Sequence, residues 1–300
     1  MPLGRVTKVF WNHFCNFSGA QKSFKVVLSL AAMMRKSVLV LLVGFVLGTT
    51  GGAYGQTLVN VSVPTALMPS SADLTPITTS APQLPLMAPD LALKTYQDKL
   101  ARQASLLSGY SDETVIHAEL VDTKQQGQYE LRRSYTAPHT LSYQKVKFEG
   151  DGFVKTNVIG RILQSEVDLV QKGNSADMAI TERNYRFNYK GRDIIDGHSV
   201  HVYQLKPRKK RPGLFKGRVY IDAQTGNILR AEGSLVKSPS FFVKKVEFVQ
   251  DYTDVKGFTF PTYLRTIAKA RIIGLAIVHV FHRGYEPQVA SVVANTAATR

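Results

Sequence analysis

Short runs of alternating apolar and polar residues fill most of the chain between residues 114 and 284, and this two-residue period predicts β-strands. Turn signals such as Asp196-Gly197 and Lys256-Gly257 separate the runs at short intervals. Connections of this length are too short for the helical crossovers that join parallel strands. The pattern therefore predicts a meandering antiparallel sheet. Its strands are expected at residues 114–122, 127–138, 140–150, 184–191, 198–207, 217–222, 227–236, 241–252, 258–268 and 275–284.

Two segments follow the 3.6-residue period of an amphipathic helix instead. The first begins at Asp90, which is suited to an N-cap, and Gly109 provides its stop. The second covers residues 153–171 and places Val158 and Ile162 on one face. Its polar residues, predicted to lie away from that face, are Arg161, Gln164, Glu166 and Asp168. Ten strands with two helices predict a mainly β (α+β) fold, in which a curled antiparallel sheet forms an open half-barrel covered by the helices.

Residues 33–55 have the three parts of a signal peptide. Arg35 and Lys36 form a short basic region. The apolar core that follows, residues 38–47, is about half as long as a membrane-spanning helix. Small residues at its end predict cleavage before Gln56. A buried helix of the folded domain is the alternative interpretation, but the residues that follow offer it nothing to pack against.

The residues in front of this signal have two interpretations. Met33 or Met34 is an ordinary start for the signal, so residues 1–32 are either an over-called upstream start or a long basic n-region. Cys15 is the only cysteine of the chain and precedes the apolar core, so it is not the cysteine of a lipobox. A mature chain that begins at Gln56 therefore has neither disulfides nor thiol chemistry.

Composition divides the rest of the chain into three parts. Residues 56–89 are rich in Ser, Thr and Pro without an apolar period, so we predict a disordered linker. Residues 90–285 are long enough to bury one sizeable core and are expected to form a single domain. Residues 286–300 are small and polar and are expected to form a flexible tail.

Candidate catalytic chemistry is sparse. The sequence contains no G-x-S-x-G, H-E-x-x-H or G-x-x-x-x-G-K motif. His198 and His201, like His279 and His282, are three positions apart, so on a strand they point to opposite faces and do not chelate a metal together. We therefore expect a protein without enzymatic activity, metal or other cofactor.

Charge adds more to the picture. The formal net charge is +16, and residues 206–218 hold seven basic residues and no acidic one. An exported protein meets little nucleic acid, but an anionic membrane attracts each Lys or Arg near its surface by roughly 1 kcal/mol. A solvated loop is the alternative, although Leu214 and Phe215 within the run favour a surface that contacts a membrane or an acylated cargo. The basic residues are Lys206, Arg208, Lys209, Lys210, Arg211, Lys216 and Arg218.

Apolar side chains alternate along several of the predicted strands. They are either the core beneath the two helices or the lining of a concave surface that is wider than two helices can fill. In the second case each buried methylene of an acyl chain would add about 0.8 kcal/mol to binding. The candidates for such a lipid cavity are Tyr129, Leu131, Tyr135, Ile162, Phe187, Val219, Ile221, Phe242, Val246 and Phe248.

A hairpin signature, "GRVYIDAQTGNILRAEG", followed by "VKKVEFVQDYTDVKGFTFPTYLRT", resembles the LolA-like family of periplasmic outer-membrane lipoprotein-sorting proteins. In the second stretch Gly257 marks a turn, and Pro261 is expected to end an edge strand. The resemblance covers residues 90–285. It implies an unclosed barrel with a hydrophobic cavity for acyl chains, in which residues 153–171 form part of a helical lid.

Two classes of function follow from these patterns and from the resemblance. The first is a monomeric periplasmic carrier, in a Gram-negative-type envelope, that binds lipid acyl chains or acylated lipoproteins and moves them toward the outer membrane. Its partners would be that cargo and an anionic membrane surface, without nucleic acid. The second is a non-enzymatic sensor or scaffold module of the envelope with the same half-barrel. A cavity that holds co-purified lipid would favour the first, and a well-filled core the second.

Overall fold

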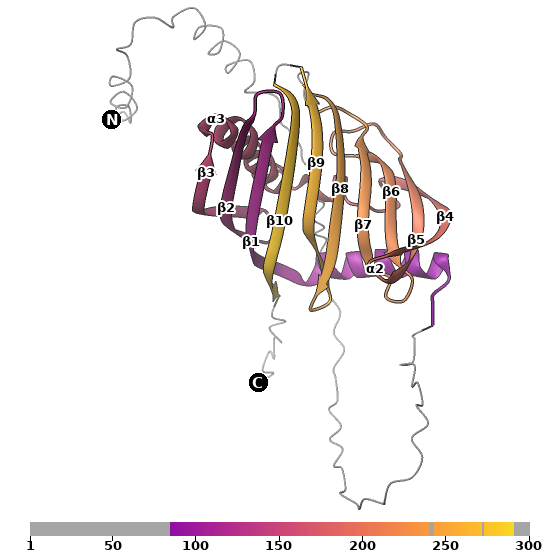
Figure 1. Ribbon diagram of the computed structural model, residues 1–300. Helices are drawn as coiled ribbons and strands as arrows, with labels where there is room; N and C mark the ends of the chain where they lie inside the picture. The colour runs from indigo at the N-terminus through magenta and orange to yellow at the C-terminus, as the bar shows by residue number, and fades with distance from the viewer. Residues whose placement is uncertain (1–84, 240–242, 272, 291–300) are drawn as a thin grey trace, which may run out of the picture. The chain divides into compact units, whose positions relative to one another are not determined.

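The computed structural model describes residues 85–239, 243–271 and 273–290 (Figure 1). The predicted signal peptide with its possible start sites, residues 56–84 of the predicted linker, Phe242 and residues 291–300 lie outside these ranges. The export signal and its cleavage before Gln56 therefore stay predictions. Within the described ranges, no helix is both long enough and apolar enough to cross a membrane.

All ten predicted strands are present in the described part of the chain, and they form one antiparallel sheet in the order β3-β2-β1-β10-β9-β8-β7-β6-β5-β4. Every pair of adjacent strands consists of chain neighbours except one, in which the first strand, β1, pairs with the last, β10. β3 and β4 lie at the two edges and the sheet is not closed, which confirms the predicted half-barrel. The strands are β1 (Leu107–Leu120), β2 (Gln125–Thr136), β3 (Thr140–Gly150), β4 (Tyr185–Ile195), β5 (His198–Pro207), β6 (Phe215–Asp222), β7 (Ile228–Leu235), β8 (Val243–Val255), β9 (Phe258–Ala270) and β10 (Gly274–Val289).

The first helix, α2 (Pro89–Leu106), runs along one end of the sheet (Figure 1). Lys99 Nζ donates a hydrogen bond to Asn227 Oδ1, in the turn between β6 and β7, over 2.7 Å. Gln103 Nε2 donates to the carbonyl oxygen of Thr259, at the start of β9, over 3.0 Å. The helix therefore fixes the turns at this end of the sheet.

Both predicted ends of this helix are wrong. Its N-cap is Ala88, and Asp90 lies inside the first turn. At the other end the chain passes directly into β1, so Gly109 is a strand residue and not a helix stop. A Cβ atom at this position would lie 2.7 Å from the carbonyl oxygen of Tyr135, so glycine is needed because β1 and β2 approach closely here.

The second predicted helix is confirmed as three consecutive pieces: α3 (Gly152–Val154), the π-helical turn η2 (Lys155–Ile159) and α4 (Gly160–Gln171). We call residues 152–171 the covering helix. Figure 1 shows it behind β1–β3. Together with the short 3₁₀-helix η3 (Asn174–Asp177), it links the two edge strands of the sheet, β3 and β4.

The expected role of Pro261 as the end of an edge strand is wrong. Pro261 lies within β9, which is a central strand between β8 and β10. The register of β8 and β9 shifts next to it, between Asp251 and Tyr252, and the pairing of β9 with β10 stops at Tyr263. The strand tolerates a residue without an N–H here because the hydrogen-bond ladder is already interrupted.

The inner face of the sheet and the helices enclose two apolar clusters. The larger cluster packs α2 and the first part of the covering helix onto most of the sheet, and it includes Tyr96, Ile162 and Leu205. The smaller cluster lies under the C-terminal end of α4 and includes Tyr135, Val170 and Phe260. The covering helix therefore contacts two separate apolar surfaces.

Candidate functional site

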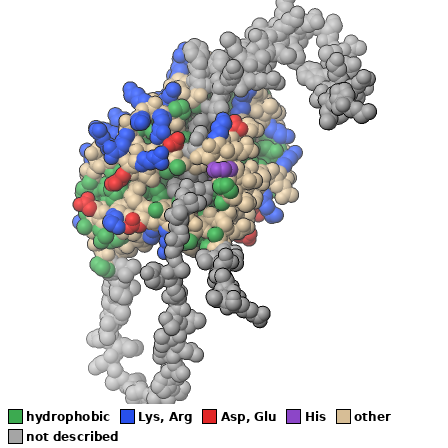
Figure 2. Space-filling model, turned by 180° about the vertical axis from the view of Figure 1, so that it is seen from behind, with side chains coloured by type: hydrophobic (Ala, Val, Ile, Leu, Met, Phe, Trp, Pro, Cys, Tyr) green, Lys and Arg blue, Asp and Glu red, His purple; other side chains and the backbone are tan. Residues whose placement is uncertain are grey.

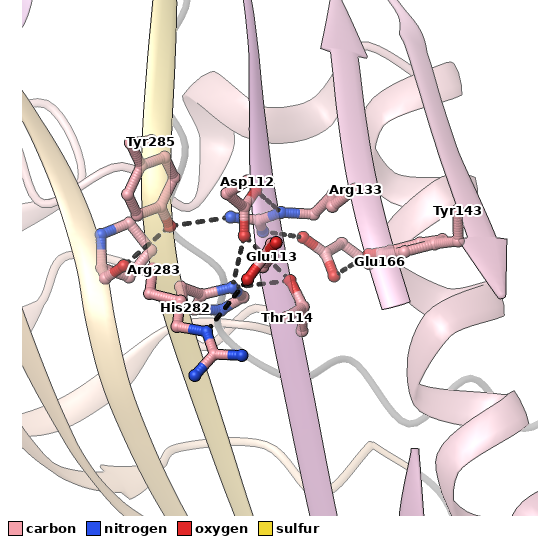
Figure 3. Close-up of polar contacts among 10 residues, drawn as sticks. Asp112, Glu113, Thr114, Arg133, Tyr143, Glu166, His282, Arg283 and Tyr285 are labelled. Atoms are coloured by element: carbon pink, nitrogen blue, oxygen red, sulfur yellow. Dashed lines mark hydrogen bonds and ion pairs between the residues drawn. The ribbon is translucent and has the colours of Figure 1, made fainter. Parts of the chain in front are cut away.

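A buried arginine on β2 joins the covering helix to the sheet (Figure 3). Arg133, on β2, is 1% exposed. Its Nε donates to Asp112 Oδ1 on β1 over 2.7 Å, and its Nη1 donates to Glu166 Oε1 on α4 over 2.9 Å. Its Nη2 donates to the hydroxyl oxygen of Tyr285 on β10 over 2.8 Å. One guanidinium thus connects three strands and a helix.

Further hydrogen bonds surround the two carboxylates. Tyr143, on edge strand β3, donates its hydroxyl proton to Glu166. Asp112 Oδ2 accepts from Thr114 Oγ1 over 2.9 Å and lies 3.0 Å from His282 Nδ1. Because a carboxylate can only accept, we assign the proton of the His282 ring to Nδ1. We call Asp112, Thr114, Arg133, Tyr143, Glu166, His282 and Tyr285 the latch network.

Burial and charge together set the ionisation of the latch network. Burial alone would raise the pKa of Asp112, but Arg133 and the hydrogen bond with His282 outweigh it, so the pKa of Asp112 is lowered. The pKa of His282 is lowered by burial and by the positive charge of Arg133. At neutral pH the network therefore contains an ionised Asp112 and a neutral His282.

The placement of Glu166 corrects the expectation that it lies on the polar side of its helix. Ile162, Glu166 and Val170 are spaced four residues apart, so they share the face of α4 that is directed at the sheet, and all three are buried. Ile162 belongs to the larger apolar cluster and Val170 to the smaller one. Glu166 is thus a buried charged residue between two buried apolar residues of the same helix face. The four-residue spacing of the three is a signal in the sequence from which the inward position of Glu166 could have been predicted.

A cleft of about 470 Å³ lies beside the latch network, between the covering helix and strands β2 and β3. Tyr129, Leu163 and Val167 give it apolar walls, and Lys155 and Arg161 supply positive charge. The complete lining is Tyr129, Tyr143, Lys155, Thr156, Gly160, Arg161, Leu163, Gln164 and Val167. Of the sequence-predicted lipid-cavity residues, only Tyr129 belongs to it.

The other lipid-cavity candidates are brought together, but as packed core. Tyr135 lies in the smaller cluster, and Phe187 packs at the margin of the larger one. Phe242 lies outside the described residues. The remaining six belong to the larger cluster, each at most 5% exposed: Leu131, Ile162, Val219, Ile221, Val246 and Phe248. In this conformation α2 and the covering helix fill the inner face over these residues.

The predicted basic run lies at the opposite side of the sheet, on β5, β6 and the loop between them. Figure 2 shows Lys and Arg side chains gathered on this side of the molecule. Across the strand register, Lys206 faces Arg186 of edge strand β4, so the charged surface extends beyond the run. The basic residues of the run are exposed, except for the half-buried Arg211.

Several members of the run have structural partners. Arg208 Nε donates to the Glu182 carbonyl oxygen, Arg211 pairs with Asp177 over 3.2 Å, and Arg218 pairs with Glu232. The expectation that Leu214 and Phe215 face a membrane or cargo is wrong, because both are fully buried in the larger cluster. Phe215 takes an inward position at the start of β6, next to the exposed Lys216, and Leu214 is buried in the loop that precedes the strand.

The two histidine pairs do separate onto opposite faces. His201 and His282 are buried, whereas His198 is exposed and His279 lies half-buried on the outer face. No group of three or more His, Cys, Asp and Glu side chains within the described ranges has a geometry that could hold a metal ion.

No protein-family model matches the sequence, and no curated protein has a significant sequence match. Several solved structures are similar to this chain, among them three that are each similar to 66% of it. They are a DUF1329 family protein from Desulfovibrio piger (11% identity, TM-score 0.35, 92% of that chain) and a putative outer membrane lipoprotein-sorting protein domain from Vibrio parahaemolyticus (12%, 0.36, 93%). The third is the LolA superfamily protein NE2245 from Nitrosomonas europaea (10%, 0.33, 93%). These matches include the family that the sequence motifs resemble. At such similarity they assign no residue role, and the half-barrel rests on the strand order itself.

Proposed function

We propose that residues 90–285 form a periplasmic carrier that binds acyl chains of lipids or acylated lipoproteins beneath the covering helix and moves them toward the outer membrane. In this proposal the protein acts as a monomer, without catalysis, cofactor or nucleic acid. The observation that carries it is the latch network, which attaches the largely apolar buried side of the covering helix to the apolar inner face of the sheet through buried charge.

The covering helix is well placed to move. It links the two edge strands, and no strand of the sheet pairs with it, so its displacement breaks no strand pairing. Displacement would uncover Leu131, Ile162 and their neighbours in the larger cluster. An acyl chain could replace the helix there, since each methylene that it buries contributes about 0.8 kcal/mol.

The latch network makes attachment of the helix conditional. Buried ion pairs are seldom better than apolar packing of the same volume, because both charges lose their hydration. A helix that only had to stay in place would be held at least as well by an apolar residue at position 166. When the helix lifts, Glu166 returns to water, while Arg133 keeps Asp112 and Tyr285 as partners. The closed state is thus a reversible contact and not a permanent part of the core.

The basic side of the sheet supports a membrane-facing role. Lys206, Lys209, Lys210 and Lys216 are exposed, and each Lys near an anionic surface contributes roughly 1 kcal/mol. This surface lies on β4–β6, away from the cleft beside β2 and β3. The carrier could therefore contact a membrane without covering the cleft.

The test measures uptake of a fluorescent fatty acid or lipopeptide, alongside thermal unfolding, for the wild type, Glu166→Gln and Asp168→Asn. Both variants remove one negative charge from α4, but among the described residues the Asp168 side chain bonds only to exposed Gln164 on the same helix. Loosening a charged hydrogen-bonded contact should make uptake by Glu166→Gln roughly tenfold faster, with Asp168→Asn close to wild type. Ile162→Ser and Phe187→Ser should lose more free energy of binding to the fluorescent ligand than free energy of unfolding.

The same experiment decides the alternative, an envelope sensor or scaffold module. The filled inner face is the observation that favours it. If the wild type takes up no lipid, and Ile162→Ser and Phe187→Ser simply unfold at lower temperature, the apolar face is plain core. The carrier proposal then fails and the module stands.

A further inference from the structure

We infer that the cleft beside the covering helix is a headgroup site for an anionic amphiphile, one that carries a carboxylate or phosphate next to its acyl chain. This inference rests on the proposed carrier function and adds the chemical class of the cargo. It follows from the charge, the walls and the position of the cleft.

The charge of the cleft has one sign. Of its nine lining residues, Lys155 and Arg161 are cationic and none is acidic. Lys155 is half-buried, and no ion pair or hydrogen bond of its ammonium group with another described residue is found. A half-buried ammonium group that is not paired with a carboxylate can bind an anion. An incoming carboxylate or phosphate replaces the hydrogen bonds with water that the ammonium group has lost on burial.

The walls of the cleft hold this ammonium in place. Lys155 Nζ lies 4.8 Å from the ring centroid of Phe148 and 5.8 Å from that of Tyr129. The two rings meet edge to face, with centroids 5.5 Å apart. Such a platform attracts a cation by its ring electrons and leaves the outer side of the ammonium free to donate.

The backbone of the covering helix shapes the floor. Lys155 begins the π-helical turn η2, a distortion that is frequent at functional sites. Gly160 follows the turn and lines the cleft, and a Cβ atom there would lie 3.1 Å from the carbonyl oxygen of Lys155. Without a side chain at Gly160, a ligand can approach the helix backbone closely.

The position of the cleft connects the headgroup to the latch network. Tyr143 lines the cleft and also donates its hydroxyl proton to Glu166. Leu163 and Val167 continue the apolar wall along α4 toward the two buried clusters. An amphiphile whose anionic group binds Lys155 would therefore place its acyl chain along the contact between the covering helix and the sheet. At about 470 Å³ the cleft has the size of a small-molecule site.

The experiment compares probes that share a twelve-carbon chain and differ in the headgroup: laurate, dodecyl phosphate, neutral dodecyl maltoside and cationic dodecyltrimethylammonium. Inorganic phosphate and acetate serve as chain-free probes. Binding to the intact chain is measured by calorimetry below the micellar concentrations. We expect laurate, dodecyl phosphate or both to bind at least tenfold more tightly than the neutral and cationic probes. The ratio of laurate to dodecyl phosphate identifies carboxylate or phosphate as the preferred headgroup.

Lys155→Gln should weaken binding of the preferred anionic probe roughly tenfold, since a charged hydrogen bond is lost. Binding of dodecyl maltoside should not change. Lys155→Arg should restore anionic binding. Lys172→Gln is the matched control, because Lys172 is exposed and directly follows α4. Thermal unfolding of each variant confirms that the cleft is still formed.

Each outcome separates the two proposals. If no amphiphile binds, the carrier proposal itself fails. If anionic and neutral amphiphiles bind equally, or if Lys155→Gln behaves as Lys172→Gln does, the carrier stands and the headgroup site is refuted. Binding of inorganic phosphate or acetate as tight as that of the corresponding amphiphile would also refute it, because the cleft would then be a site for small anions.

Discussion

Replacing Arg133 by Met should be among the most damaging single changes in this domain. Methionine keeps much of the side-chain volume but removes the charge and every donor. Asp112 is 2% exposed and Glu166 is 9% exposed, so neither carboxylate can recover water in the folded state. Breaking a buried ion pair from one side costs about 3–5 kcal/mol. Because a domain is stable by only about 5–15 kcal/mol, this single change removes a large part of the total.

The neighbouring residue provides the control. Arg132 precedes Arg133 on β2 and points to the outer, exposed face. Arg132→Met should therefore change the unfolding free energy by no more than about 0.5 kcal/mol. A triple variant, Arg133→Met with Asp112→Asn and Glu166→Gln, should recover most of the loss, because it leaves no buried charge without a partner.

Urea unfolding followed by circular dichroism measures all three proteins. The midpoint should fall strongly for Arg133→Met, with little change in slope, since the same surface is exposed on unfolding. A loss within about 1 kcal/mol of that of Arg132→Met would refute the reasoning. It would mean that the latch network is hydrated in solution and contributes no conditional attachment of the covering helix.

Three further predictions concern other parts of the domain. The pKa of His282 is lowered in the folded state, so the contribution of His282 to stability is complete above its unfolded pKa of about 6.5 and is lost as pH falls below that value. The urea midpoint of the wild type should therefore fall between about pH 7 and pH 5, and His282→Gln should make this fall smaller. If the urea midpoint of His282→Gln depended on pH as strongly as that of the wild type, the prediction would be wrong. Gly217→Ala should lower the melting temperature by several degrees, because its Cβ would overlap the Glu232 carbonyl oxygen. Gly152→Ala should not, because its Cβ would meet nothing within 4 Å; equal melting curves would exclude the close approach at Gly217. Changing three exposed lysines to Gln should weaken binding to anionic vesicles and its salt dependence, while binding that is unaffected would make the run a solvated loop. These lysines are Lys206, Lys209 and Lys210; Arg211 is left intact because it holds Asp177 and Asn184.

The alternation of apolar residues was sufficient to predict the strands, because most of them bury one face in the core. It did not predict that β1 begins at Leu107, since the period of the helix runs into the strand without a break. Nor could it predict the pairing of β1 with β10, which depends on residues far apart in the chain. Periodicity describes the environment of a residue and not the identity of its neighbours.

Most of the candidate site could not be predicted from the sequence, for a related reason. Asp112, Arg133 and Glu166 are charged, and charged residues are normally assigned to the surface. Arg133 does occupy an inward position of β2, two residues from Leu131 and two from Tyr135, so the alternation contained the information. Leu214 and Phe215 were misread in the opposite sense, because the lysines around them suggested exposure. For Arg133 and Phe215 the strand period was a better guide than the local charge.

The pairing of the first strand with the last has a consequence for the order in which the domain can assemble. β1–β3 and β4–β10 are each built from chain neighbours, but Leu107 pairs with Val289, so the two blocks join only when the final strand has been made. Contacts between such distant residues slow folding, because the chain must close a long loop before it gains from them. Until then β1 presents an unpaired edge that can associate with other chains. A chain that ended before β10 would therefore aggregate rather than form a smaller stable domain, and nascent copies would depend on protection until their last strand arrives.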